Sequence, residues 1–121
     1  MCYNLLISPN IKGKKMCLFC KIVNKEIPSN IILEDDNFIA FHDINPKAPL
    51  HILAIPKLHM DSFTDVRCEM MSNMTSFIKK IAEEVKIEEI GYRFITNTGD
   101  YGGQEVKHLH FHVLGGAKLK W

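Results

Sequence analysis

This 121-residue sequence has no apolar run that approaches the length needed to cross a lipid bilayer. Its formal net charge is only +1, and lysine and arginine are spread along the chain rather than clustered. A nucleic-acid-coating surface would need a clustered basic excess, so we expect neither a membrane nor a nucleic acid as a partner. A small anionic ligand is still allowed, because a local site can hold one without a global charge bias.

Cysteine is also scarce, and four unevenly placed residues are too few for a disulfide scaffold. A reducing intracellular compartment fits best, and we expect a cytoplasmic protein that could also enter the nucleus. The amino-terminal lysines follow a short apolar patch instead of preceding it, unlike those of a secretory signal. We expect residues 1–15 to form a disordered extension, with Met16 as an alternative start, and residues 16–121 to form one domain.

Hydrophobic residues make up 46% of the chain, which is enough for a packed core. Apolar residues at helical spacing predict a long helix, whereas short apolar or alternating runs between turn residues predict strands. The expected strands are Ile31–Glu34, Phe38–Asp43, Pro49–Pro56, Tyr92–Asn97 and Val106–Leu114, and the expected helices are Leu18–Asn24 and Thr64–Lys86. The fold class they predict is α+β, with a five-stranded antiparallel sheet, one long helix and a short amino-terminal helix.

Three histidines, His108, His110 and His112, alternate with apolar residues near the carboxyl end. On a strand the three imidazoles would share one face, and the residues between them would pack against the long helix. A solvated polar face is the plainest interpretation, but three alternating histidines are a costly way to be merely polar. The functional alternatives are a metal site, or catalysis by one imidazole whose neighbours fix its tautomer and charge.

A glycine-rich loop precedes these histidines and bears on that choice. Gly99, Gly102 and Gly103 let the backbone approach a ligand closely and offer N–H groups to an anion. The side-chain amides of Asn97 and Gln104 add neutral donors. An anion-binding loop followed by histidines indicates a phosphorus centre that is attacked by an imidazole.

A second motif, C-x2-C at Cys17 and Cys20, has the spacing with which two thiolates can bind one metal ion. The same spacing suits a redox couple, but the thioredoxin-like context that a redox couple needs is absent. Two reduced cysteines packed beside the amino-terminal helix are the remaining alternative. A closed metal site would need two further ligands.

Several separated motifs give the sequence a resemblance to a known family. They are "KEIP", "EDD", "AFHDINPKAP", "HILAIPKLH", "NTGDYGGQ", "HLHFHVLGG" and the final Trp121, and they cover roughly residues 16–121. The sequence resembles the histidine triad (HIT) family, and within it the Hint branch of nucleotide-binding proteins. This resemblance implies a HIT-like fold whose sheet extends across a homodimer, with Trp121 reaching toward the partner's site.

The resemblance also implies an activity, the hydrolysis of purine nucleoside 5'-phosphoramidates to AMP or GMP and an amine. His110 would be the nucleophile, through a phosphohistidine intermediate, and His112 would contact the phosphate. His51 would hydrogen-bond to His110 and hold its reactive nitrogen outward. The expected catalytic residues are therefore His51, His108, His110 and His112.

The nucleotide would be bound by a ribose contact, an apolar wall around the base and a phosphate cradle. Asp43 would accept hydrogen bonds from the ribose hydroxyls, and the loop amides would hold the phosphate. The residues expected at the nucleotide are Phe19, Ile22, Ile27, Phe41, Asp43, Ile44, Asn97, Gly103, Gln104, Glu105, Val106, His110 and His112.

Glu105 departs from the family pattern, because many Hint proteins carry a serine at this position. A carboxylate beside a phosphate is repulsive when it is ionised, but it could protonate a leaving amine if its pKa were raised. The alternative is that the side chain points to solvent and only the backbone amide belongs to the site.

Zinc is the one metal that the resemblance implies, in a structural role with no cofactor needed for catalysis. The ligands would be Cys17, Cys20, His59 and His108, and catalysis would then be left to the other three histidines. Three other functions stay open: a nucleotide-binding scaffold or regulatory protein, a dinucleoside polyphosphate hydrolase of the Fhit-like branch, and a small zinc-binding interaction module.

Overall fold

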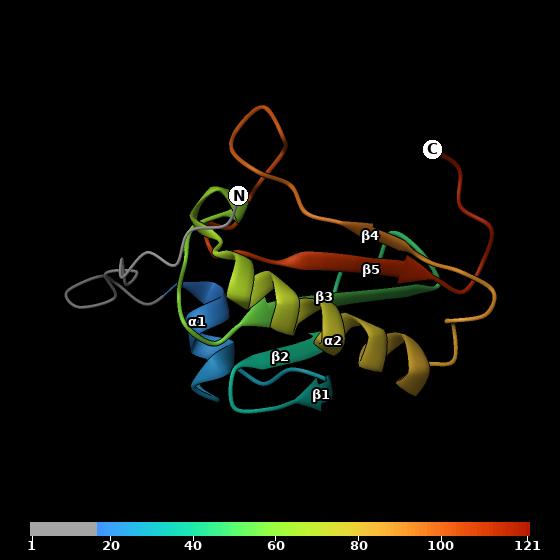
Figure 1. The fold of residues 1–121 in the computed structure, drawn as a ribbon, viewed down its shortest axis with the longest axis horizontal. Helices are drawn as coiled ribbons and strands as arrows, with labels where there is room; N and C mark the ends of the chain where they lie inside the picture. The colour runs from blue at the N-terminus through green and yellow to red at the C-terminus, as the bar shows by residue number, and fades with distance from the viewer. Residues whose placement is uncertain (1–16) are drawn as a thin grey trace.

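The computed structural model describes residues 17–121 as two helices, a 3-10 turn and a five-stranded antiparallel sheet. The strand order is β1-β2-β3-β5-β4 (Figure 1). The bounds are α1 Leu18–Val23, β1 Ile31–Glu34, β2 Phe38–His42, β3 Leu50–Pro56, η1 Phe63–Asp65, α2 Cys68–Glu84, β4 Arg93–Ile95 and β5 Phe111–Gly115. The predicted fold class is confirmed, whereas the predicted extension and alternative start lie outside the described residues.

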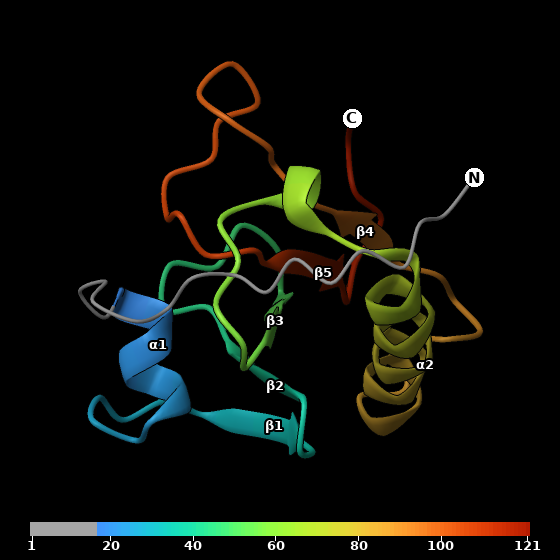
Figure 2. The same ribbon diagram turned by 60° about the vertical axis from the view of Figure 1, so that its left-hand side comes forward.

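The two helices lie on opposite sides of the sheet, as Figure 2 shows. The central strands β2 and β3 are apolar at almost every position because both of their faces are covered. Successive residues of these strands enter different clusters: Phe38 and Ala40 join the core under α2, while Ile39 and Phe41 join the one beside α1. The sheet therefore has a packed layer on each face.

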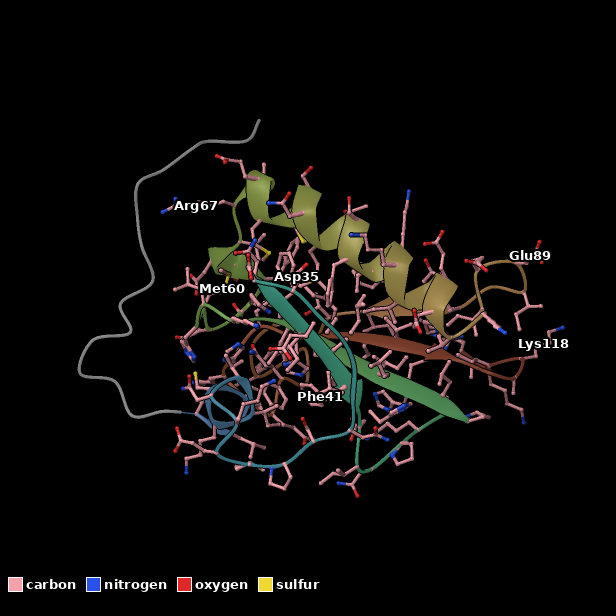
Figure 3. All side chains as sticks on the ribbon, turned by 90° about the horizontal axis from the view of Figure 1, so that it is seen from below. Asp35, Phe41, Met60, Arg67, Glu89 and Lys118 are labelled. Carbon is pink, nitrogen blue, oxygen red and sulfur yellow. The ribbon has the colours of Figure 1, made fainter. Side chains whose placement is uncertain are left out.

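The larger core lies between α2 and the sheet, where side chains fill the space in Figure 3. The three apolar residues that alternate with the histidines belong to it, as the alternation predicts. They are Leu109, Phe111 and Val113, and they pack in the same cluster as Met74, Phe77 and Ile81 of α2.

The long helix begins later than its periodicity predicts. Thr64 lies in η1, where its backbone N–H donates to the Ser62 hydroxyl at 3.2 Å. Val66 then returns to an extended conformation, so that α2 begins only at Cys68. Side-chain capping of a separate short turn, which apolar spacing does not reveal, accounts for the difference.

The last strand is also shorter than predicted, because only Phe111–Gly115 pairs with β3. The residues before it follow a different neighbour: the backbone N–H of Leu109 donates to the Met60 carbonyl at 2.7 Å. His108 and His110 therefore precede β5, and their side chains are not held on one face by strand pairing. The other strands agree with the prediction to within one or two residues at each end.

No helix among residues 17–121 is both long enough and apolar enough to cross a membrane.

Replacement of Ile81 by alanine is expected to lower the free energy of unfolding by about 2–5 kcal/mol, because Ile81 is fully buried under the sheet and the change leaves a cavity. Urea unfolding measures this loss. Lys80, exposed on the same helix, is the matched control, and Lys80→Ala should change stability by less than about 0.5 kcal/mol. Similar losses in both variants would contradict the assigned core.

Candidate active site

The ring of His110 is held by a backbone carbonyl. Its Nδ1 lies 2.8 Å from the carbonyl oxygen of His108, which can only accept, so Nδ1 carries the proton when the ring is neutral. The ring packs edge-on against Phe19 and His112, with centroid distances of 5.1 Å to each, and the residue is 6% exposed. In the neutral ring this arrangement leaves the lone pair of His110 on Nε2.

His51 and His112 form a second, oriented pair. The backbone N–H of Lys47 donates to Nδ1 of His51 at 3.0 Å, which places the His51 proton on Nε2. That nitrogen lies 2.8 Å from Nδ1 of His112, so His112 accepts there and keeps its own proton on Nε2. The predicted hydrogen bond from His51 to His110 is wrong. In the structure His51 is hydrogen-bonded to His112, and Nδ1 of His110 is hydrogen-bonded to the backbone carbonyl of His108.

Burial keeps the rings of His51 and His112 uncharged near neutral pH. Removal from water lowers the pKa of His112 to about 4, with further lowering by the neighbouring rings of His110 and His51. Burial also lowers the pKa of His51, against the opposing attraction of Asp43. The rings thus enter the site as neutral hydrogen-bonding groups with fixed donor and acceptor ends.

Asp43 follows β2 directly and lies beside this pair. Its backbone N–H donates to the His51 carbonyl at 2.9 Å, and one carboxylate oxygen accepts from the Asn45 backbone at 2.8 Å. The other carboxylate oxygen lies 3.4 Å from Nε2 of His51. The turn after β2 therefore positions a partly exposed acceptor beside the histidines.

The glycine-rich loop between β4 and β5, at the top of Figure 1, is braced from inside by its amide side chains. Gln104 donates through its amide nitrogen to the carbonyls of Asp61 at 2.6 Å and Val106 at 2.9 Å, and its oxygen accepts from Gly99 at 3.0 Å. Both amide hydrogens are thus used within the chain. The predicted role of Gln104 as a side-chain donor to an anion does not fit this geometry, since its amide shapes the loop instead.

Asn97 likewise donates to the carbonyl of Gly102 at 2.8 Å across the loop. A Cβ atom at Gly102 would lie 2.3 Å from the Thr98 carbonyl oxygen, so that only glycine fits there. Gly103 has φ +81, a conformation that L side chains rarely adopt, and is exposed. Near the side-chain hydrogen bonds that brace the loop, residues 99–103 carry no bulky side chain other than that of Tyr101, which is exposed.

The residues expected to surround the base are brought together, with one exception. Three of them, Phe19, Ile22 and Phe41, are members of the buried cluster beside α1, and Ile27 packs against it. The same cluster is also contacted by Val106, which was expected elsewhere at the nucleotide. Ile44 stands apart from this cluster and is 90% exposed. Glu105 is also exposed, which agrees with the reading in which its side chain points to solvent.

The four expected metal ligands converge although they come from three separate segments. The two thiol sulfurs of Cys17 and Cys20 and the Nδ1 atoms of His59 and His108 are separated by six distances of 3.1–3.6 Å. A tetrahedral zinc site with the usual bond lengths has ligand–ligand distances of roughly 3.3–3.8 Å. The donor set and its spacing therefore fit a zinc ion.

The outer nitrogens of the two histidines expected as metal ligands are also engaged. Nε2 of His108 lies 2.8 Å from the Pro56 carbonyl, and Nε2 of His59 lies 2.8 Å from a carboxylate oxygen of Asp61. These contacts leave both Nδ1 atoms facing the cluster, as ligand histidines require. Burial lowers the pKa of His108 to about 4, and burial, followed by the contact with Cys17, raises the pKa of Cys20 to about 11.

Sequence reasoning missed three partners in this region: the carbonyl of His108, the backbone N–H of Lys47 and the carboxylate of Asp61. Backbone groups carry no residue signature, so no pattern could reveal the first two. The proximity of Asp61 to the ligand His59, two residues away, is the one signal that the sequence offered.

The chain is similar in sequence to known proteins. The sequence model of the HIT domain matches residues 24–119. The purine nucleoside phosphoramidase of Escherichia coli is 48% identical over 105 residues, covering 84% of this chain and 88% of the relative.

Two solved structures are similar in fold as well as in sequence. A histidine triad protein from Clostridium difficile is 50% identical with a TM-score of 0.84, covering 88% of this chain and 96% of its own. A HIT family hydrolase from Legionella pneumophila is 45% identical with a TM-score of 0.83, covering 87% and 96%. The resemblance seen in the sequence motifs is thereby confirmed, and the chain belongs to the HIT domain family.

Proposed function

We propose that this protein hydrolyses purine nucleoside 5'-phosphoramidates, releasing AMP or GMP and an amine through a covalent intermediate on His110. The observation that carries this proposal is that two neighbouring imidazole rings, those of His110 and His112, are held in opposite tautomers. His110 presents a lone pair on Nε2, while His112, 5.1 Å away between ring centroids, presents an N–H on Nε2. A phosphorus centre between them would meet a nucleophile and a hydrogen-bond donor together.

In the first step, Nε2 of His110 attacks phosphorus and the P–N bond of the substrate breaks. The leaving amine takes a proton from solvent, and the water that attacks in the second step returns one to solvent. Positive charge that develops on the His110 ring is stabilised at Nδ1–H by the His108 carbonyl. His112 donates from Nε2 to a phosphoryl oxygen, because its Nδ1 is already occupied by His51. Water then attacks the phosphohistidine, the P–Nε2 bond breaks, and the nucleoside monophosphate is released.

Nucleotide contacts follow from the position of the surrounding groups. Asp43 is a partly exposed acceptor beside the pair and suits the ribose hydroxyls. The backbone amides of Glu105 and Val106, which follow the braced loop, suit the phosphate, whereas the backbone N–H of Gly103 already donates to the Asp100 carbonyl at 3.1 Å. The apolar cluster beside α1 suits a purine base, because Phe19 already packs against His110.

The relatives support the enzyme class that the sequence predicted, and a named phosphoramidase at 48% identity supports this substrate class. A nucleotide-binding scaffold would not need a nucleophile whose tautomer is fixed. A dinucleoside polyphosphate hydrolase could use the same attack by His110, and the two activities differ only in the leaving group.

Zinc is proposed as a structural ion held by Cys17, Cys20, His59 and His108, whose mutual distances suit tetrahedral coordination. When bound, the ion would cross-link the start of α1 to the segments that carry the two histidines. The reaction at His110 needs no metal chemistry, because the imidazole itself supplies the nucleophile.

The homodimer stays a prediction from the resemblance, and the edge strand β4 is the element that could continue the sheet into a second copy. Phe94 on this edge is 43% exposed, and the exposed Trp121 lies over Arg93 at 5.6 Å. The cytoplasmic location, with the nucleus as a second compartment, also remains a prediction.

His110→Ala is expected to lower amine release from adenosine 5'-phosphoramidate by at least about 10³-fold, because the covalent intermediate cannot form. AMP binding, measured by titration calorimetry, should persist in this variant, since the other contacts remain.

His42 supplies the matched histidine control, because it lies on β2 outside both histidine groups. His42→Ala should retain most of the wild-type rate. Undiminished turnover by His110→Ala would overturn the proposal. Faster cleavage of a diadenosine polyphosphate than of the phosphoramidate by the wild type would replace the proposed substrate class.

Acid is expected to destabilise the wild type more than His112→Asn. The unfolded His112 takes up a proton near its ordinary pKa of 6.5, whereas the folded ring, with a pKa of about 4, does not. Its contribution to stability is therefore present above pH 6.5 and is lost as the pH falls toward 4. Between pH 8 and pH 5 the extra loss should be about 1–2 kcal/mol, the lower value allowing for solvent screening of a half-buried ring.

Urea unfolding of both proteins at the two pH values, with the same zinc content, measures this difference. A parallel decline of the two stabilities would show that His112 is not held neutral by burial.

The wild type is expected to bind one zinc ion and to release protons, because the Cys20 thiol, with its pKa of about 11, must ionise to bind the metal. Calorimetry in buffers of different ionisation enthalpy measures the proton release. Cys20→Ser should weaken zinc binding by more than the roughly 10–100-fold that loss of an outer partner costs. His42→Ala should bind as the wild type does, and equal affinity in Cys20→Ser would exclude the proposed ligand set.

A further inference from the structure

His108 belongs to the metal cluster and to the active site at once. Its Nδ1 lies 3.2 Å from the Cys17 sulfur and 3.2 Å from Nδ1 of His59, facing the cluster. Its backbone carbonyl accepts the hydrogen bond that fixes the tautomer of His110, at 2.8 Å. The residue is fully buried, and its Nε2 is held by the Pro56 carbonyl. A metal on this ring would therefore restrain the group that orients the nucleophile.

A second route of contacts, in addition to the one through the ring and the backbone carbonyl of His108, leads from His59 to the glycine-rich loop. Nε2 of His59 lies 2.8 Å from the carboxylate of Asp61, and the carbonyl of the same Asp61 accepts from Gln104 at 2.6 Å. Gln104 in turn accepts from the backbone N–H of Gly99 at 3.0 Å. The orientation of one metal ligand is thus connected to both ends of the loop by three hydrogen bonds.

The two routes are themselves joined, because the backbone N–H of Leu109 donates to the carbonyl of Met60 at 2.7 Å. Met60 lies between His59 and Asp61, and Leu109 lies between His108 and His110. Each metal-ligand histidine therefore sits on a segment that also carries a group of the active site. These segments contain no regular strand at this point, so hydrogen bonds and the cluster itself hold them in place.

We propose that the Cys17–Cys20–His59–His108 cluster is a positioning element for the reaction at His110, with Asp61 and Gln104 as positioning residues that transmit metal occupancy to the glycine-rich loop. The inference rests on the proposed function, since it assumes that the loop and His110 receive a nucleotide phosphate. With zinc in place, the His108 carbonyl and the loop amides are already oriented before the nucleotide binds. Without zinc, nucleotide binding must first order these segments, which weakens it.

The coupling between two equilibrium binding sites is reciprocal. Zinc should therefore tighten AMP binding by the same factor by which AMP tightens zinc binding, and we expect roughly tenfold in each direction. Calorimetry measures AMP affinity of the zinc-loaded and zinc-free protein, and competition with a chromophoric chelator measures zinc affinity with and without AMP. Circular dichroism of the zinc-free protein shows whether the fold persists.

Variants of Asp61 and Gln104 test the second route at two points. Asp61→Ala removes the partner of His59 and should weaken zinc binding by roughly 10–100-fold, whereas Asp61→Asn, which retains an acceptor oxygen, should restore most of the affinity. Asp36→Ala, which removes an exposed carboxylate in the turn between β1 and β2, is the charge control and should leave zinc affinity unchanged.

Gln104→Ala interrupts the second route without touching a ligand, so it should keep the wild-type zinc affinity measured without AMP. Its coupling factor should fall by several-fold. If zinc-free wild type does not fold, the zinc-loaded Gln104→Ala protein carries the test, and it should bind AMP several-fold more weakly than the wild type.

AMP affinity that is equal with and without zinc, in a protein whose phosphoramidate turnover depends on His110, would overturn this inference alone. In the zinc-loaded comparison, wild-type AMP affinity of Gln104→Ala would do the same. Failure of the zinc-loaded wild type to bind AMP would overturn the proposed function and this inference together.

Discussion

The hydrogen bond from Nδ1 of His110 to the carbonyl of His108 determines which nitrogen of the central imidazole can react. A backbone carbonyl can only accept, so the ring proton is fixed on the buried side and the lone pair faces the other way. In the pair of His51 and His112 a backbone donor has the opposite effect. The backbone N–H of Lys47 donates to Nδ1 of His51, so His51 donates from Nε2 to His112, and His112 keeps its own N–H on Nε2. Two backbone groups thus give one of two chemically identical side chains a lone pair on Nε2 and the other an N–H there.

Burial keeps the neighbouring histidine rings in their neutral forms. Removal from water lowers the pKa of His112 and His108 to about 4, so both rings stay neutral at pH 7. The apolar layers on the two faces of the sheet provide that environment: Phe19 and its cluster lie on one side, and the α2 core lies on the other. The same packing places His108 against Cys17, which caps α1, and against Cys20 within it, where a neutral Nδ1 is suited to bind a metal.

Particular elements show where sequence reasoning held and where it did not. The strands bounded by prolines and turn residues were predicted to within one or two positions, since their apolar pattern reflects direct burial. The strand expected from Val106 begins only at Phe111, because the pairing with β3 covers residues 111–115 alone and the backbone N–H of Leu109 donates to the Met60 carbonyl instead. Gln104 was expected to face an anion, yet its amide is saturated by carbonyls of Asp61 and Val106, which are set by the path of the chain.

The sequence by itself determined the α+β class, the alternation that buries Leu109, Phe111 and Val113, and the cysteine pair of the candidate metal cluster, since residue type and spacing carry this information. The two histidines of that cluster, His59 and His108, were expected from the family resemblance and not from spacing. Only the tertiary structure decided that His51 is hydrogen-bonded to His112 and that a backbone carbonyl accepts from His110. It also decided that His108 contacts the cysteine cluster through its ring and His110 through its carbonyl. These choices depend on backbone groups and on segments far apart in the chain. Strand register and packing bring those segments together, and no local pattern encodes them.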